Sequence, residues 1–299
     1  DGYMKPIGSG NKEAIIQYQF DRANDVTHSY DFYYTPGGDF SINKETGGGY
    51  GTPTQEMVES YELATGGFPD WTPWHDVTTQ TPPYADLEPR FHASVLYNGA
   101  PWKGRKIEPY VGGADGWGQW NLEREPKGRT TTGYYLRKMV DESHDVIAYS
   151  GGVQPLIVLR YAEVLLNKAE ACHKTNDPAG ANAAVRAIRD RVGLPYEDVT
   201  GDDLWKAIRQ ERKVELAYEG LWYWDLRRWK VAHKPYPEGL TGYQQHGLKI
   251  EKNNDGTFTY TYVSVDDQDR NFPEKMYRFP MPTGELNNNG KVEQYSEWK

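Results

Sequence analysis

The sequence predicts a mainly α fold, built as a helical scaffold with long irregular loops and a few short β-strands. Helical periodicity is sustained in one long stretch, residues 155–230 of 299. Glycine and proline, 31 and 19 residues, punctuate most of the remaining chain, which favours turns and loops there. The chain also holds 10 Trp, 23 Tyr and 8 Phe, too many for a solvated coil, so we expect these loops to be ordered.

The first predicted helix begins at Pro155, where a first-turn proline removes no helical hydrogen bond, and ends near Lys174. Its apolar stripe recurs at spacings of four and three residues through Val158, Ala162, Leu165, Ala169 and Cys172. The stripe is widened by Ile157, Tyr161 and Val164, which predicts cover on more than one side. The lone cysteine excludes an internal disulfide, and its place on the stripe favours a small core residue.

A second helix is predicted after Asp177, its N-cap, with Pro178 as the first helical residue and Gly193 beyond its end. Many of its apolar residues are alanines, which allow a close helix crossing. Two antiparallel helices joined by a short turn, with small residues between them, are similar to a tetratricopeptide pair. The sequence therefore predicts a tetratricopeptide-like scaffold, although no second copy recurs at a fixed period.

The third helix is predicted to begin at the Thr200–Asp203 capping pattern and to stop at Gly220. A short aromatic helix, Trp222–Lys230, completes the platform of residues 155–230. Residues 1–150 form a loop-rich candidate ligand face, and residues 231–299 form C-terminal loops and short strands. Short elements are expected at residues 11–20 (strand), 53–63 (helix), 91–97 (strand before an Asn98-Gly99 turn), 131–141 (extended) and 256–265 (strand).

Composition excludes several classes of protein. The mean hydropathy of −0.84 excludes a membrane-spanning helix. A net charge of −9 without a long basic run argues against nucleic-acid binding. The chain starts at Asp1 with no targeting signal or lipid-attachment cysteine, so we expect a processed or truncated product.

The sequence shows no catalytic motif, such as a nucleophile elbow, a phosphate loop or a metal-spaced histidine pair. Glu211, Glu215 and Glu219 share one face of the third helix. We interpret them as an ion-pair network with basic partners such as Arg160, Arg227 or Arg228. No catalytic residue, metal ligand or cofactor is therefore expected. The alternative is a helical glycoside hydrolase that uses two of these acids, or Asp70 with Glu88.

Aromatic residues in the irregular loops are the main candidates for binding. Tyrosine and tryptophan offer a flat apolar face with a polar edge, which suits sugar rings or peptides. For each ring the alternative is inward packing that holds a loop. For the set we expect at least two exposed rings among Tyr33, Tyr34, Tyr50, Trp71, Trp74, Trp117 and Trp120.

Several motifs resemble the C-terminal half of SusD/RagB proteins, in family order. They are NKEAIIQYQF (11–20), EPRFHASVLYNGAPWKG (88–104), RYAEVLLNKAEA (160–171), IRQERKVELAYEGLWYWDLRRW (208–229) and MYRFPMPTGELNNN (276–289). The resemblance implies a cell-surface outer-membrane lipoprotein that binds oligosaccharides and passes them to a SusC-like TonB-dependent transporter. It implies a binding protein and not an enzyme, held at the membrane by an N-terminal lipid that this chain does not contain.

The resemblance also implies which region of the chain holds the ligand site, although it does not identify single residues. Family members carry stacking aromatics ahead of the RF-A-V motif, where this chain has Tyr50, Trp71 and Trp74, with Asp70 and His75 as polar companions. Peptides or glycoprotein fragments are an alternative ligand, and a purely structural adaptor is an alternative role. The possibility of a structural calcium ion also stays open, since no sequence motif places a calcium site. Because the family's N-terminal half is absent, we expect the platform to expose apolar surface.

Overall fold

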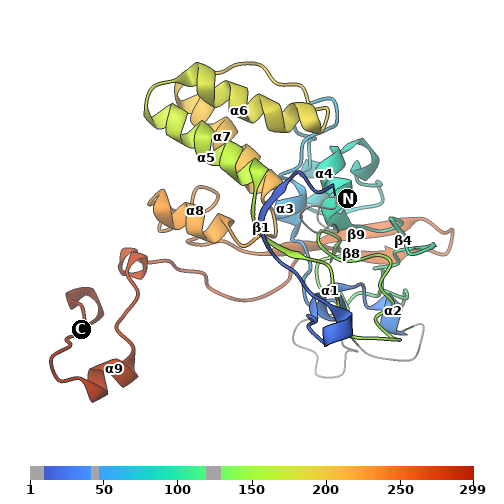
Figure 1. Ribbon diagram of the computed structural model, residues 1–299. Coiled ribbons are helices and arrows are strands. Elements are labelled where there is room, and N and C mark those ends of the chain that lie inside the picture. The colour runs from blue at the N-terminus through green and yellow to red at the C-terminus, as the bar shows by residue number, and fades with distance from the viewer. Residues whose placement is uncertain (1–9, 42–46, 119–128) are drawn as a thin grey trace. The chain divides into compact units, whose positions relative to one another are not determined.

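The computed structural model describes residues 10–41, 47–118 and 129–299 (Figure 1). Helix outweighs strand, 33% against 16%, which agrees with the mainly helical class that the sequence predicts. The chain divides into two compact units, Asp1–Tyr218 with Gln245–Asp266 and Glu219–Gln244 with Asp267–Lys299. Among the described residues, no helix is long and apolar enough to cross a bilayer.

The elements follow one another in short pieces outside the central helices. The α-helices are α1 (Tyr30–Tyr34), α2 (Gly38–Ser41), α3 (Gln55–Val58), α4 (Pro89–Ser94), α5 (Tyr161–Lys174), α6 (Pro178–Arg191), α7 (Gly201–Glu215), α8 (Trp222–Arg228) and α9 (Thr283–Asn288). The strands are β1 (Ala14–Tyr18), β2 (Val77–Thr78), β3 (Val95–Leu96), β4 (Pro101–Trp102), β5 (Arg105–Lys106), β6 (Tyr135–Leu136), β7 (Leu156–Arg160), β8 (His246–Lys252) and β9 (Phe258–Ser264). The 3₁₀ turns are Arg22–Asn24, Thr72–Trp74, Tyr84–Asp86, Glu274–Tyr277 and Ser296–Trp298.

Helices α5, α6 and α7 lie side by side and share a small apolar core (Figure 1). The predicted start of α6 is confirmed, because the Asp177 carboxylate accepts a hydrogen bond from the backbone N–H of Gly180 at 2.9 Å. Helix α7 ends five residues before Gly220, and the side chain of Thr200 makes no capping hydrogen bond. The buried core of the three helices is Ala169, Ala181, Ala184, Val185, Leu204 and Ile208.

The helix predicted from Pro155 is wrong over its first turn. Leu156–Arg160 is the strand β7, paired antiparallel with β1, and α5 begins only at Tyr161. The sequence LIVLR is rich in β-branched residues, and so short an apolar run does not separate strand from helix by periodicity. The predicted cover on a second side is also wrong, since Tyr161 and Val164 are exposed.

Apolar surface is exposed where the ribbon of β1 and β7 meets α5, as we expected for the platform. Tyr18 lies opposite Leu156 in the antiparallel register, and the two side chains are 66% and 47% exposed. Val158, two residues further along β7, is 52% exposed. A two-stranded ribbon with an uncovered apolar face has little stability of its own.

Of two other predicted strands, one differs from the structure and one is confirmed. Residues 91–94 continue the short helix α4, which begins at Pro89, and only Val95–Leu96 is strand. The predicted strand at 256–265 is present as β9, and its partner β8, which the sequence did not reveal, pairs with it over seven residues. The sheet β2-β9-β8 packs its buried residues Leu248, Ile250 and Tyr260 into the main core.

A buried ion-pair network joins α7 to the loop-rich part of the first unit. Arg90, from α4, bonds Glu88, Glu211 and Glu215, and Arg160 donates to Glu215 at 2.7 Å. Arg189, from α6, donates to Glu62 at 2.7 Å and to Glu211 at 3.2 Å. The interpretation of the α7 acids as structural ion pairs is therefore confirmed for Glu211 and Glu215.

The second unit holds α8 and the C-terminal segment. Its core is Leu226, Ala232 and Phe272, with Trp222 and Trp229 packed against it. The guanidinium of Arg227 donates to the backbone oxygens of Met276 and Tyr277 at 2.5 and 3.0 Å. This contact ties α8 to the segment that follows Asp267.

Removing the charge of Glu215 should weaken the fold in a pH-dependent way. Burial alone would raise its pKa, but Arg160, Arg191 and Arg90 outweigh burial and lower the pKa from 4.5 to about 2. The native carboxylate therefore stabilises the fold above pH 4.5 and loses that effect as the pH falls toward 2. We expect Glu215→Gln to lower the free energy of unfolding at pH 7 by about 3 kcal/mol, since it removes the negative charge that the buried Arg90 and Arg160 share.

Urea unfolding followed by circular dichroism at pH 7 and pH 3 measures this effect. Glu197→Gln, at an exposed site, is the matched control and should change stability by less than about 0.5 kcal/mol. Equal stability of Glu215→Gln and the wild type at pH 7 would show that the network does not hold α7.

Candidate functional site

Trp71 and Trp74 are positioned by a short turn that Asp70 initiates. The Asp70 carboxylate accepts a hydrogen bond from the backbone N–H of Thr72 at 3.0 Å, and the 3₁₀ turn Thr72–Trp74 follows. This turn brings the two indole rings to 5.6 Å between centroids, edge to face. Hydrogen bonds from the Thr72 side chain and backbone also keep the pKa of Asp70 below its ordinary value.

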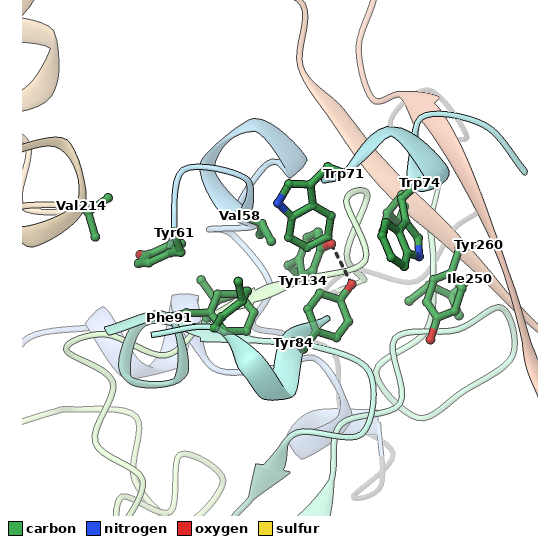
Figure 2. Packing of buried hydrophobic residues seen from close by; sticks show 13 residues of the cluster. Val58, Tyr61, Trp71, Trp74, Tyr84, Phe91, Tyr134, Val214, Ile250 and Tyr260 are labelled. Atoms are coloured by element: carbon green, nitrogen blue, oxygen red, sulfur yellow. Dashed lines mark hydrogen bonds between the residues drawn. The ribbon is translucent and has the colours of Figure 1, made fainter. Parts of the chain in front are cut away.

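Both indoles are buried, with 6% and 7% of their surface exposed. Figure 2 shows them beside Tyr84 and Tyr134, whose hydroxyl oxygens lie 2.8 Å apart. Trp74 donates its Nε1–H to the backbone oxygen of Gln80 at 3.0 Å, whereas Nε1 of Trp71 is buried without a hydrogen-bond partner in the described part of the chain. The expectation that these rings form an exposed stacking surface is not supported by their placement, because core contacts cover them.

His75 lies at the exposed edge of this cluster, in a row of rings and carboxylates. Its Nε2 donates to Glu59 at 2.7 Å, and its ring centroid lies 4.9 Å from that of Tyr262, on β9. Tyr262 in turn stacks on His246, on β8, at 4.4 Å, and Nδ1 of His246 donates to Glu56 at 2.5 Å. The sequence could not reveal Tyr262 and His246 as neighbours of His75, since they come from a hairpin about 170 residues later.

Tyr50 is the most exposed of the predicted aromatic site residues, at 64%. Its ring meets that of Tyr33, which is 44% exposed, at 5.1 Å and 74°. The backbone N–H of Tyr50 donates to the backbone oxygen of Tyr33 at 3.0 Å, which fixes the pair at the base. The expectation of at least two exposed loop aromatics is met by these two; Trp120 lies outside the described residues.

Glycine is what allows this placement of Tyr50. Gly48 and Gly49 both have φ near +70°, a conformation that other residues rarely adopt. A Cβ on Gly48 would lie 2.3 Å from the backbone oxygen of Thr35, so a side chain cannot be accommodated there. The glycines Gly48 and Gly49 therefore allow the backbone path that leads to Tyr50.

Four of the acids that the sequence offers for glycoside hydrolysis accept hydrogen bonds from the protein. Asp70 is exposed and holds its own turn, whereas Glu88 is buried and bonds Arg90 at 2.5 Å and the backbone N–H of Glu62 at 3.3 Å. Glu211 and Glu215 are held by arginines in the ion-pair network. In the described residues, no group of three His, Cys, Asp or Glu side chains is arranged to hold a metal ion.

The family model for the SusD family matches residues 12–298. The chain belongs to the SusD family. Its resemblance to SusD/RagB proteins, predicted from five motifs, is thereby confirmed. SusD-like protein P38 of Formosa agariphila is 39% identical over 87 residues, which are 26% of this chain and 17% of that protein. SusD-like protein P2 of the same organism is 36% identical over 97 residues, 28% of this chain and 19% of that protein.

Solved structures of SusD-like proteins match nearly the whole chain. A SusD-like protein of Bacteroides fragilis has a TM-score of 0.74 at 27% identity, over 99% of this chain and 56% of its own. A SusD-like carbohydrate-binding protein of the same species has a TM-score of 0.72 at 25% identity, over 96% of this chain and 55% of its own. This SusD-family chain therefore spans about half the length of these solved relatives.

A more distant relative was solved with a glycan. Surface glycan-binding protein A of Bacteroides thetaiotaomicron, in complex with laminarihexaose, has a TM-score of 0.57 at 17% identity, over 97% of this chain and 53% of its own. At this identity the likeness shows the fold alone.

The burial of Trp74 predicts a structural effect. We expect Trp74→Ala to lower the free energy of unfolding by about 3–5 kcal/mol, because it leaves a cavity in the core. Tyr50→Ala, at an exposed position, should change it by less than about 0.5 kcal/mol. Urea unfolding followed by far-ultraviolet circular dichroism compares the two variants directly. A Trp74→Ala protein as stable as the wild type would contradict the buried placement.

Proposed function

We propose that this chain binds oligosaccharides through an exposed aromatic surface centred on Tyr50. The observation that carries the proposal is the exposure of two rings in contact, Tyr50, which follows the glycines Gly48 and Gly49, and Tyr33, on α1. Two rings at an angle offer apolar faces to the C–H side of a sugar and leave their hydroxyl groups for hydrogen bonds. The carbohydrate-binding relative of Bacteroides fragilis supports this choice of ligand.

The exposed polar residues near Trp71 and Trp74 are the second part of the proposed surface. Asp70 and His75 are both exposed, and carboxylates and imidazoles are suitable partners for sugar hydroxyl groups. Trp71 and Trp74 then act beneath the surface, by holding the turn that presents these two side chains. The carbohydrate-binding relative of Bacteroides fragilis supports a glycan, rather than a peptide, as the first ligand to test.

The wider role is proposed from family membership. The protein is expected to lie at the cell surface as an outer-membrane lipoprotein and to deliver glycans to a SusC-like TonB-dependent transporter. It is proposed to act as a binding protein, without catalysis and without a cofactor, on a tetratricopeptide-like helical scaffold. The pairing of Glu211 and Glu215 with arginines supports a structural rather than a catalytic use of these acids.

Tyr50→Ala tests the site. Loss of one stacking ring should weaken glycan binding about three- to tenfold. The measurement is isothermal titration with laminarihexaose and with the best ligand from a glycan array. Tyr161→Ala, which removes a tyrosine of similar exposure on α5, is the matched control and should bind as the wild type does. Equal affinity of Tyr50→Ala and the control for the glycan would overturn Tyr50 as the binding site. Binding of peptides, with no binding of glycans, would overturn oligosaccharides as the ligand class.

Gly48→Ala tests the positioning of Tyr50 without touching its ring. The added methyl group would clash with the backbone oxygen of Thr35 and displace the turn. We expect a loss of affinity comparable to that of Tyr50→Ala. Gly99→Ala, at another glycine with positive φ but with open space around it, should leave glycan binding unchanged. The same titrations compare the two variants.

A further inference from the structure

A cavity of about 890 Å³ lies within the first unit, apart from the Tyr50 surface. It is lined by α4, the segment 137–143, Arg160 and the ends of α6 and α7. Its apolar lining comes from small and medium side chains, including Ala93, Met139, Val192 and Val214. A cavity of this size holds a small ligand such as a short oligosaccharide.

Positive charge gathers on the lining, although the chain as a whole is acidic. Five cationic side chains line the cavity, Arg90, Arg137, Lys138, Arg160 and Arg191, against the three acids Asp141, Glu142 and Glu215. Burial lowers the pKa of His92, the remaining titratable group on the lining, which favours its neutral form. The lining is therefore biased toward an anionic ligand.

The buried cations on the lining are already committed to the protein. Arg90 and Arg160 bond Glu88, Glu211, Glu215 and Glu13. The ammonium group of Lys138 donates to the backbone oxygens of Glu215 and Ala217, each at 3.0 Å. Arg90, Arg160 and Lys138 contribute positive charge to the cavity, but they have few hydrogen-bond donors left for a ligand.

Two arginines at the mouth of the cavity keep donors for a ligand. Arg191, whose side chain is 46% exposed, gives one Nη2–H to Glu215 at 2.6 Å, and its Nε and Nη1 have no partner among the described residues. Arg137, 26% exposed, gives Nε to Glu142 at 2.6 Å and Nη1 to the backbone oxygen of His92 at 3.1 Å, so its Nη2 stays open within the described chain. A charged guanidinium with an open N–H group can donate a hydrogen bond to an oxyanion.

The acids at the mouth do not cancel this preference. One oxygen of Asp141 accepts both the backbone N–H and the hydroxyl of Ser143, at 2.8 and 2.7 Å. Glu142 is paired with Arg137, and Glu215 accepts from three guanidinium groups. Arg191 and Arg137 therefore offer open N–H groups beside acids that already accept hydrogen bonds from the protein.

We propose that this cavity binds an acidic sugar, with the carboxylate of a uronic acid residue held by Arg191 and Arg137. The choice of a sugar as the carrier of the acid group rests on the proposed function, whereas the preference for an oxyanion rests on the cavity itself. Carboxylate and sulfate groups present similar oxygens to a guanidinium, so both enter the test as separate arms.

Isothermal titration of the 299-residue chain tests the proposal with three probes of equal length: a trigalacturonate, a sulfated trisaccharide and a neutral trisaccharide. We expect the trigalacturonate to bind at least tenfold more tightly than the neutral sugar, and its affinity to fall between 50 and 300 mM salt. Arg191→Gln and Arg137→Gln should each weaken this binding about tenfold or more, because each removes a charged hydrogen-bond donor.

Arg186→Gln is the matched control. Arg186 lies on the same helix as Arg191, has a similarly exposed side chain and pairs with one acid, Asp198, at 2.6 Å, but does not line the cavity. It should leave binding unchanged, and far-ultraviolet circular dichroism should show that all three variants are folded. Equal binding of acidic and neutral probes, preference for the sulfated probe alone, or an equal loss in Arg186→Gln would overturn the proposal.

Tyr50→Ala separates this proposal from the proposed function. Trigalacturonate binding that survives in Tyr50→Ala and is lost in Arg191→Gln supports the cavity as a distinct site. Glycan binding that is lost in Tyr50→Ala and unchanged in Arg191→Gln overturns the cavity and leaves the proposed function standing. Absence of binding by any sugar would overturn both.

Discussion

Buried arginine–carboxylate pairs determine how the parts of the first unit fit together. Glu211 and Glu215 project from α7 toward Arg90 on α4, Arg160 at the end of β7 and Arg189 on α6. A buried charge without its partner is costly, so each of these elements is constrained to the one position that satisfies all the others. Apolar packing alone would tolerate small shifts between helices, whereas these directional contacts do not. The positions of α4, α6, α7 and β7 in turn fix the ends of the loops that connect them.

The loop-rich half of the unit replaces regular structure with aromatic packing. Trp71, Trp74, Tyr84 and Phe91 form a core under segments that have few strand pairings. The hydroxyl of Tyr84 donates to that of Tyr134, which in turn donates to Gln55. Irregular backbone can then stay fixed enough to present side chains outward. Tyr50 and His75 are the result: Tyr50 follows two glycines of positive φ, and His75 follows the 3₁₀ turn Thr72–Trp74. The chain belongs to the SusD family, and its exposed rings, rather than its buried ones, are the candidates for ligand contact.

The sequence predicted the central helices well because their signals are local. Asp177, Pro178 and Gly193 mark the ends of α6 by their own backbone preferences. Leu156–Arg160 was misassigned because strand pairing with β1 depends on residues far away in the sequence. The site was predicted only in part for the same reason. Composition could not separate buried Trp71 and Trp74 from exposed Tyr50, and the contacts of His75 with Tyr262 depend on a hairpin that no local pattern connects to it.

The ribbon of β1 and β7 also bears on how the chain folds. Glu13 and Arg160, which close the end of this ribbon, are separated by 147 positions. Closing so long a loop costs more chain entropy than joining neighbours, whereas α5, α6 and α7 follow one another and meet through short connections. Helix pairing can therefore precede the arrival of the N-terminal strand. Arg160 then lies beside Glu215 before the N-terminal segment arrives. Its ion pair with Glu13 can form before the apolar residues of β1 and β7 are in register.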